Sequence, residues 1–469
     1  MAMKRKMSGS NMANRNKRIK KEEEEEDQSR STRGMVVDTY TYQLPELVIS
    51  QIISHLSFKY IIKASILSKE WASLCSSVLV LDIDEDEGKK QCDDHDTKQR
   101  REFLKFLTSC LKIYENQKHL EKLRLHMRYL GAGDCKINKS VSFALERNVK
   151  ELDICFKREN SVRKSKYYCL HQTLLSNAKS LTILKLENLR IEEDSIDPIT
   201  FPSLKTMSLK AVKFTGNTGF SRLYSGCPCI EYLSLNLCHG WDVRLSSSRL
   251  KHLEILCCEI KLRVEATNLE SFKFQGDHGL RRHIIDLQKS FYIASCQTLR
   301  SLEFSHTRFP SGWFQGLDSR FPYLERLALH TCFSYSGLII SSQNLRSFVF
   351  HECRYILSKL YAPNLSEATI TIEQRRDYDR LRIFFGNFDS CKKIRLHVNE
   401  AEICIFPEEM RKKCSPPLPS LQCLEVEIDT VTTTAVAHSA LMDSLRWMAP
   451  SLEFLSINRI YYIYDSRIS

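Results

Sequence analysis

The chain has 469 residues, of which 42% are apolar and 27% charged, and its formal net charge is +12. This composition provides enough apolar side chains for a large core and excludes a wholly disordered or collagen-like chain. No run approaches the roughly 20 apolar residues that span a bilayer, and the N-terminus is basic and polar, unlike a signal peptide. We therefore expect the protein to stay on the cytosolic or nuclear side, without membrane contact.

The 18 cysteines are under 4% of a long chain that has no export signal, so we interpret them as reduced thiols. No CxxC pair occurs; the nearest approaches are Cys227 with Cys229 and the adjacent Cys257 and Cys258. Neither has the spacing of a zinc finger. The sequence therefore predicts no metal site.

Residues 1–34 form a tail with strong charge and almost no apolar content. Nine Lys or Arg residues stand against six acids over residues 1–30. We predict disorder because burial cannot offset the entropy of ordering such a segment. Its two basic clusters are spaced like a bipartite nuclear import signal, and the alternative is a solvated charge run that no receptor reads. The signal would place the protein in the nucleus, as well as in the cytoplasm, and would comprise Lys4, Arg5, Lys6, Lys17, Arg18, Lys20 and Lys21.

Residues 44–78 have the apolar spacing of three short helices. Pro45 and Glu46 suit a first helical turn, and Ser68 is a predicted N-cap for the last helix. Apolar residues recur at helical spacing between and after these positions. So small a module buries little core of its own and usually needs a partner or a neighbouring domain to cover its apolar surface.

The string LPELVISQIISHLSFKYIIKASILSKEWASL, from Leu44 to Leu74, resembles an F-box, the motif by which substrate receptors dock onto the Skp-family adaptor of cullin–RING ubiquitin ligases. The likeness lies in the Leu-Pro-Glu sequence at 44–46, the segment 52–56 and the segment 67–71. The resemblance implies an F-box domain over residues 38–80. Its adaptor-facing surface would be formed or supported by Leu44, Pro45, Ile53, Leu56, Ile62, Ser65, Leu67 and Trp71.

The sequence departs from this family pattern in two places. Ser57 and Phe58 stand where Leu-Pro is common, which would change the turn between the first two helices, and Glu70 stands where a basic residue is common. The second departure would weaken a polar contact to the adaptor. The alternative interpretation of the whole module is a helical cap that packs on the domain behind it. An acidic stretch follows, with eight acids and two lysines over 82–96, and we interpret 82–100 as a linker or solvated loop.

The pattern apolar-x-x-apolar-x-apolar returns about 14 times between residues 120 and 457, at spacings of 19 to 32 residues. Its apolar-x-apolar step has the two-residue period of a strand. The array resembles a leucine-rich-repeat solenoid, in which each unit adds one strand to a parallel sheet. We therefore predict an α/β fold, with a three-helix module followed over 101–469 by a curved solenoid whose parallel sheet lines the concave face.

Two further expectations concern the turns and the convex side. Cysteines stand where such repeats favour Asn or Cys after the strand, and we interpret them as small buried groups: Cys238, Cys258, Cys332 and Cys353. Because the spacing is unequal, we expect helices mixed with irregular loops on the convex side.

The outward strand positions on the concave sheet carry mixed polar residues suited to recognising a protein. His330 and His351 occupy equivalent positions in neighbouring repeats; a small anion, metal or pH-sensitive contact is one interpretation, and two solvated histidines the other. The predicted substrate-binding residues are Arg124, Lys185, Lys210, Lys273, His330, His351, Arg395 and His397.

The sequence contains no phosphate-binding loop, GxSxG elbow or HExxH motif, so we expect no catalytic residue and no cofactor. The resemblance implies a non-catalytic substrate-recognition subunit of a Skp–cullin–F-box ubiquitin ligase, linked through the adaptor to a cullin scaffold and a RING subunit. Its repeats would bind an unknown protein substrate. The alternative is a non-ligase nuclear solenoid that contacts nucleic acid or another polyanion. We disfavour nucleic acid because the strand phenylalanines occupy inward positions and leave no stacking platform.

Overall fold

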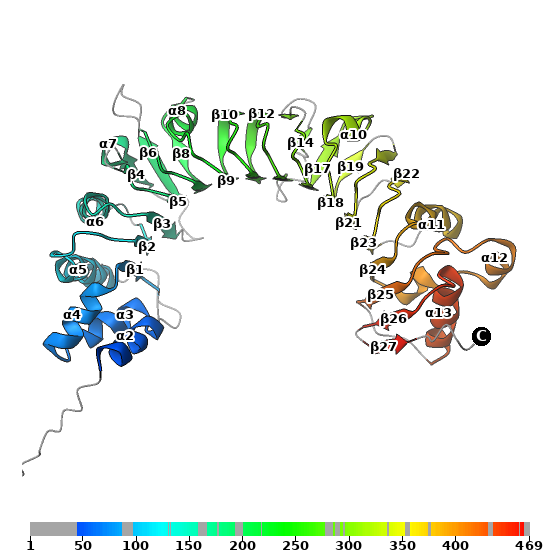
Figure 1. Ribbon diagram of the computed structural model, residues 1–469, viewed down its shortest axis with the longest axis horizontal. Helices are drawn as coiled ribbons and strands as arrows, with labels where there is room; N and C mark the ends of the chain where they lie inside the picture. Colours follow the sequence, from blue (N-terminus) through cyan, green and yellow to red (C-terminus); the bar gives the residue numbers. More distant parts are fainter. Residues whose placement is uncertain are drawn as a thin grey trace, which may run out of the picture.

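The computed structural model describes residues 45–86, 97–129, 131, 133–157, 167–175, 178–192, 200–216, 218–276, 285–286, 291–293, 296–334, 337–351, 357–373, 377–429, 435–458 and 460–463. They form an arch with three short helices at its N-terminal end (Figure 1). The predicted import residues, and the tail to which they belong, lie outside the described residues. Among the described helices, none combines the length and apolar character needed to cross a membrane.

One 16-stranded sheet lines the inner side of the arch (Figure 1). Its neighbouring strands are parallel up to β26, and the last strand pairs antiparallel. The fourteen predicted repeat strands all lie in this sheet as β2 to β26, which confirms the α/β solenoid. In spatial order the strands are β1 (Val80–Asp84), β2 (Lys122–Arg128), β3 (Glu151–Lys157), β5 (Ile183–Glu187), β7 (Thr206–Lys210), β9 (Tyr232–Asn236), β11 (His252–Leu256), β13 (Ser271–Gln275), β16 (Ser301–Ser305), β18 (Arg326–His330), β21 (Ser347–His351), β23 (Glu367–Ile372), β24 (Lys393–Val398), β25 (Cys423–Ile428), β26 (Phe454–Ile457) and β27 (Ile460–Ile463).

The acidic stretch differs from its predicted form, because part of it is structured. Leu81 and Ile83 are buried between acids that face outward, so the alternation produces strand β1 on the open edge of β2. Helix α5 (Thr97–Ile113) then covers the outer side, and its first residues also fall within the predicted loop. The apolar residues of this stretch recur every second position, but the acids between them make the whole stretch resemble a solvated loop.

The outer side of the arch carries helices and small sheets. The expectation of irregular loops there was wrong for several repeats, because alternating residues such as Val243 and Leu245 are buried and support strands. The helices after α5 are α6 (Asp134–Glu146), α7 (Gln172–Leu175), α8 (Gly219–Ser225), α10 (Leu317–Arg320), α11 (Tyr378–Phe385), α12 (Glu408–Lys413) and α13 (Ala435–Met448), with short 3₁₀ turns η1 (Gly386–Phe388) and η2 (Ala401–Cys404). The outer strands are β4 (Tyr168–His171), β6 (Leu189–Glu192), β8 (Lys213–Phe214), β10 (His239–Ser246), β12 (Glu259–Glu265), β14 (Ile285–Asp286), β15 (Phe291–Ile293), β17 (Thr307–Phe309), β19 (Phe333–Ser334), β20 (Leu338–Ser341) and β22 (Leu357–Tyr361).

A repeated backbone turn leads the chain out of the concave strands. The residue after the strand has a left-handed φ near +50° in several repeats, as at Ala211, Leu237 and Thr331, and its N–H donates to the last carbonyl of the next strand. Gly276 makes the same N–H bond, to Ser305. A Cβ at Gly276 would clash with the carbonyl oxygen of His306, so this repeat requires glycine.

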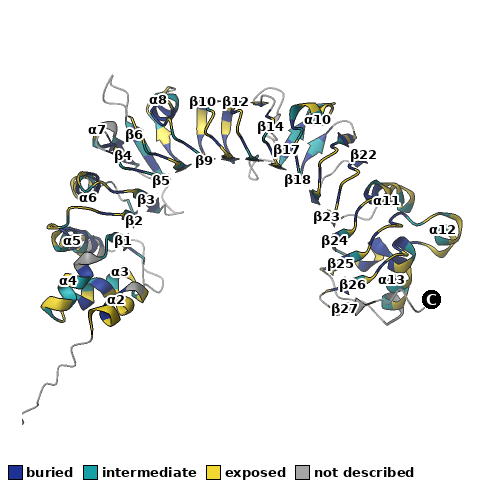
Figure 2. Ribbon diagram, viewed as in Figure 1, coloured by how far each residue is buried: buried dark blue, intermediate teal, exposed yellow. Residues whose placement is uncertain are grey.

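The core runs along the whole arch between the concave sheet and the outer layer (Figure 2). Inward strand phenylalanines such as Phe272, Phe304 and Phe348 are fully buried in it. The thiols of Cys238, Cys258 and Cys332 are buried as well, and each lies within reach of strand carbonyls. The structural interpretation of these three cysteines is confirmed, and Cys353 lies outside the described residues.

Binding surfaces of the helical module and the concave sheet

The N-terminal module consists of helices α2 (Glu46–His55), α3 (Phe58–Ala64) and α4 (Lys69–Ser77). Pro45 precedes α2, and its carbonyl accepts the N–H groups of Val48 and Ile49. The Ser68 side chain accepts the N–H of Trp71 at 3.2 Å, so the predicted N-cap of α4 is confirmed. A hydrogen bond with Ser68 also lowers the pKa of the exposed Glu70.

The module has a small core of its own. Ile49, Ile53 and Ile61 are buried there with Ala64 and Cys75, and four partly buried apolar side chains pack against them. Phe58, by contrast, belongs to the core of the solenoid. Helix α3 begins at this residue, so the Ser57–Phe58 departure places an aromatic ring under the repeats rather than a proline in the turn.

The structure distributes the predicted adaptor-facing residues over different environments. Ile53 is only 2% exposed, and Ile62 is half-buried against the solenoid core, so burial favours a supporting role for Ile53 in particular. Leu56 and Trp71 are half-buried against the core of the module. Ser65 donates to the carbonyl of Ile62 at 2.7 Å.

Two of the predicted residues do face solvent: Pro45 is exposed, and Leu67 is 70% exposed. Leu44 lies outside the described residues. Sequence reasoning missed other apolar side chains that face solvent. A signal for them was present, because the helices contain more apolar residues than one buried face can hold. We call the full group the exposed F-box set: Leu47, Val48, Ile52, Tyr60, Ile66 and Leu67.

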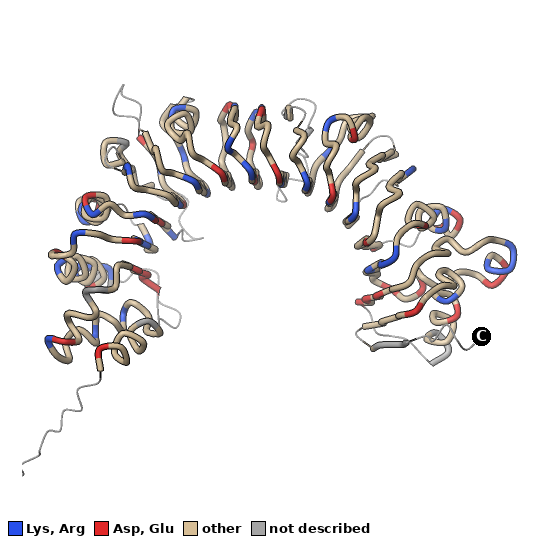
Figure 3. Tube along the Cα trace, in the orientation of Figure 1, with Lys and Arg blue, Asp and Glu red and all other residues tan. Residues whose placement is uncertain are grey.

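The concave sheet presents both signs of charge along the inner edge of the arch (Figure 3). The predicted basic side chains each have an acidic neighbour on an adjacent strand, which limits the positive potential available to a polyanion. The contacts are Arg124 Nη1 to Asp82 Oδ1 at 2.8 Å, Lys185 Nζ to Glu151 at 3.0 Å, Lys210 Nζ to Glu187 at 2.8 Å, Lys273 Nζ to Glu303 at 2.8 Å, and Arg395 Nε to Glu425 at 2.7 Å.

The predicted histidine pair is present on β18 and β21. The rings of His330 and His351 lie 5.8 Å apart between centroids, and His351 Nδ1 is 2.7 Å from Thr371 Oγ1. Burial lowers the pKa of His330, while the carboxylate of Glu303 acts in the opposite direction. His397 lies apart from this pair, near Glu427 and Asp429 at 3.8 and 3.5 Å.

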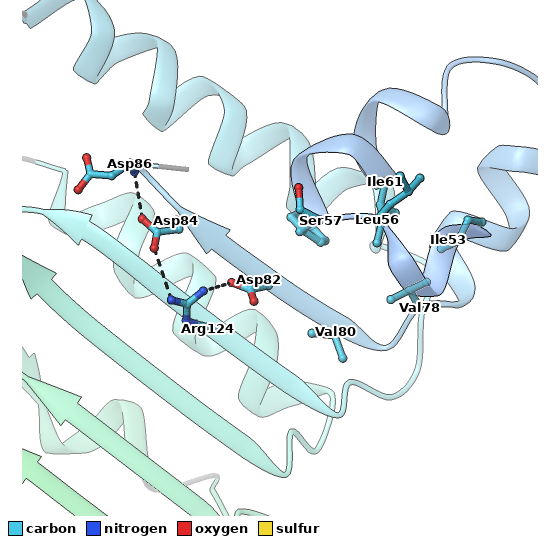
Figure 4. A pocket seen from close by; sticks show the side chains of 11 residues that line it. Ile53, Leu56, Ser57, Ile61, Val78, Val80, Asp82, Asp84, Asp86 and Arg124 are labelled. Carbon is cyan, nitrogen blue, oxygen red and sulfur yellow. Dashed lines mark hydrogen bonds and ion pairs between the residues drawn. The ribbon is translucent and has the colours of Figure 1, made fainter. Parts of the chain in front are cut away.

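A groove of about 530 Å³ lies where the helical module meets the first concave strands (Figure 4). Its apolar wall comes mainly from α2, α3 and the chain that leads into β1, and its polar wall from β1 and β2. Sequence periodicity does not reveal this site, because the two walls meet only in the folded chain. The groove is lined by Ile53, Leu56, Ser57, Phe58, Ile61, Val78, Val80, Asp82, Asp84, Asp86 and Arg124.

The polar wall of the groove is an ordered charge network. Arg124 lies between Asp82 and Asp84 (Figure 4), and Lys157 Nζ contacts Asp84 at 2.7 Å and Asp86 at 3.0 Å. Burial opposes ionisation of Asp84, but the Lys157 hydrogen bond and the nearby cations outweigh it and lower the pKa of Asp84. The carboxylate is therefore charged at neutral pH. Among the described residues, those of the groove included, no group of three or more His, Cys, Asp or Glu side chains is arranged to hold a metal ion.

The structure thus combines a three-helix module with a parallel-sheet solenoid of the leucine-rich-repeat kind. The family model of the F-box domain matches residues 42–82, and the model described as "FBD-associated F-box protein At5g56370, LRR repeats" matches residues 137–284. The matched stretches thus comprise an F-box domain and part of a leucine-rich-repeat array.

Relatives in Arabidopsis thaliana carry the same domain names. The F-box/LRR-repeat protein At3g59210 is 31% identical over 46% of this chain and 43% of its own length. The F-box/FBD/LRR-repeat protein At1g78750 is 25% identical over 55% of this chain and 57% of its own length. The chain thus matches about half the length of these curated relatives. A chain of the crystal structure of the Rad7 and Elc1 complex in yeast overlaps 97% of this chain and 94% of its own, but a TM-score of 0.28 at 12% identity carries no argument.

Proposed function

We propose that this chain is a non-catalytic substrate-recognition subunit of a Skp–cullin–F-box ubiquitin ligase. The F-box would bind a Skp-family adaptor, and through it a cullin scaffold and a RING subunit, while the concave sheet would bind a target protein. Ubiquitination then follows from proximity, because holding the target near a charged conjugating enzyme raises their effective concentration. We also propose nuclear import through the basic clusters between Lys4 and Lys21.

The observation that carries this proposal is the exposed F-box set. Leu47 is 84% exposed and Ile66 is 83% exposed, on a module whose own core is complete without them. Apolar side chains so open to water gain free energy when a partner covers them, roughly 1.5–3 kcal/mol for each fully buried side chain. Such a surface supports docking of an apolar partner.

Co-purification of the full chain with a Skp-family adaptor and a cullin tests the proposal. Replacing Leu47 and Ile66 by Asp is expected to abolish adaptor capture, because a charge would be buried at the contact. Replacing Leu44 and Pro45 by Ala should have the same effect. The matched control is Ile383→Asp, which changes an apolar residue 59% exposed on the outer helix α11. Retained capture by both F-box variants would refute the adaptor role.

A further inference from the structure

We propose that the acidic run 22–27 of this chain docks on the outer helices α5 and α6, where five cations form one continuous surface. We call this surface the basic face, and it consists of Arg101, Lys105 and Lys112 of α5 with Lys136 and Lys139 of α6. The inference goes beyond the proposed function, because it assigns a contact within the chain that involves neither the exposed F-box set nor the concave sheet.

Helices α5 and α6 lie side by side on the outer side of the arch (Figure 1). Lys136 Nζ donates to the carbonyl of Leu104 at 3.4 Å, and Arg147 Nη2 donates to that of Glu115 at 2.8 Å. In both contacts the two residues are 32 positions apart in the chain, so the helices run parallel to each other. Cations that flank these contacts on either helix therefore border one shared seam.

The cations of the basic face are exposed and lack acidic partners. Arg101, Lys105 and Lys112 recur at helical spacing, so one side of α5 carries them, and Lys136 and Lys139 lie three residues apart on α6. All five are exposed. No acid in the described part of the chain forms an ion pair with any of them. Their positive potential is therefore available to a partner.

The acids on these two helices do not neutralise the basic face. Asp134, at the start of α6, accepts the hydroxyl of Tyr129 at 2.6 Å, and Glu146, at its end, lies 4.0 Å from Arg147. By sequence Glu102 is the other acid of the two helices. The middle of the seam thus keeps an excess of positive charge.

The chain itself contains a segment of complementary charge. Residues 22–27 are six consecutive acids, and the stretch 22–44 contains seven acids and two arginines, a net charge of −5. Such a segment is attracted to a basic surface. The basic clusters within 1–21 are repelled from the same surface, so the acids are the part that docks.

The connection to the F-box is long enough for this contact. Residues 28–44 separate the acidic run from Pro45, and at about 3.3 Å per extended residue they reach roughly 55 Å. From Pro45, the path to the basic face follows α2 for about 15 Å, crosses the Phe58–Tyr114 contact of 6.1 Å and follows α5 for about 15 Å. Attachment to the chain also raises the effective concentration of the acids at the face.

Fluorescence anisotropy on the full chain tests the inference with a labelled peptide that has the sequence of residues 22–34. In a variant whose residues 22–27 are replaced by Gln, the basic face is vacant and the peptide should bind. The unmodified chain should bind the peptide about tenfold more weakly, because its own acidic run competes. Replacing Lys105, Lys136 and Lys139 by Gln in the vacant-face variant should weaken binding about tenfold, and salt should weaken it as well.

The matched control replaces three exposed lysines elsewhere by Gln, namely Lys179, Lys261 and Lys359, in the same vacant-face variant. It should leave the affinity for the peptide unchanged. Circular dichroism melting checks that each variant is folded. Equal loss of affinity in the control and in the basic-face variant would overturn the inference, because the peptide would then follow net charge alone.

Three further outcomes would also overturn the inference. Equal peptide binding by the unmodified and vacant-face chains would show that the basic face is open to an acidic segment of another molecule. If replacing Asp93, Asp94 and Asp96 by Asn, rather than replacing 22–27, raises the affinity, the other acidic stretch is the occupant. A dimer in analytical ultracentrifugation that is lost on replacing 22–27 would place the acidic run on a second copy of the chain.

Discussion

The rings of Phe58 and Tyr114 lie 6.1 Å apart between centroids, and together they join the F-box to the solenoid. Tyr114 lies just beyond the end of α5, and its hydroxyl donates to the carbonyl of Cys75 in α4 at 3.2 Å. Both rings are buried. The F-box is therefore held against the first repeats by packing and a hydrogen bond as well as by the chain connection.

Phe58→Ala should lower the stability of this junction by about 3–5 kcal/mol, because a buried aromatic ring is replaced by a cavity. Tyr114→Phe should cost only about 1 kcal/mol, since it removes one hydrogen bond and keeps the ring. Urea unfolding followed by tryptophan fluorescence measures both. Equal effects of the two substitutions would show that ring packing does not hold the junction.

Gly276→Ala should destabilise the centre of the arch by about 1–3 kcal/mol, because the new methyl group meets the carbonyl of His306 and forces the backbone to shift. Gly240→Ala provides the comparison: its φ is +79°, but no atom lies within 4 Å of the added Cβ. Only the left-handed backbone strain of about 1 kcal/mol applies there. Thermal unfolding of both variants separates steric clash from strain, and a smaller loss at Gly276 would contradict our account.

Glu85→Gln should destabilise the N-terminal repeats by about 3–5 kcal/mol, because it leaves the buried Arg100 without its ion partner. Arg100 Nη1 lies 3.3 Å from Glu85 Oε2, and burial lowers the pKa of this arginine while Glu85 raises it. Lys412→Gln breaks an exposed pair with Glu408 and should change nothing measurable. The urea midpoint measures both, and similar midpoints for the two variants would contradict this prediction.

Lowering the pH should lower the free energy of unfolding, and His330 should contribute to this loss. Its pKa is lower in the folded than in the unfolded chain because burial, together with the neighbouring His351, Lys273 and Arg326, outweighs the effect of Glu303. The unfolded chain therefore binds more protons between the folded pKa and about 6.5, so stability falls as the pH drops below about 6.5.

His330→Gln should flatten this part of the stability profile, measured by urea unfolding between pH 5 and 8. The exposed His119→Gln is the control and should leave the slope as it is. If the free energy of unfolding depends on pH in His330→Gln as it does in the unmodified protein, groups other than His330 cause the pH dependence.

The sequence by itself determined the F-box helices, the strand register of the repeats and the inward aromatic residues. These follow from short-range periodicity, in which buried side chains recur every two or every three to four residues. Strand β1 escaped this reasoning because acids alternate with Leu81 and Ile83, and charge obscured the period.

Only the tertiary structure decided which side chains meet across strands and which remain open to solvent. Lys185 and Glu151 are 34 residues apart in the chain yet form an ion pair, because parallel strands align distant residues. Leu67 and Ile53 are both apolar F-box residues, but one faces water and the other the core. The groove likewise lies between helix residues and β1 residues that meet only in the folded chain, and Phe58, which lines it, also packs on Tyr114.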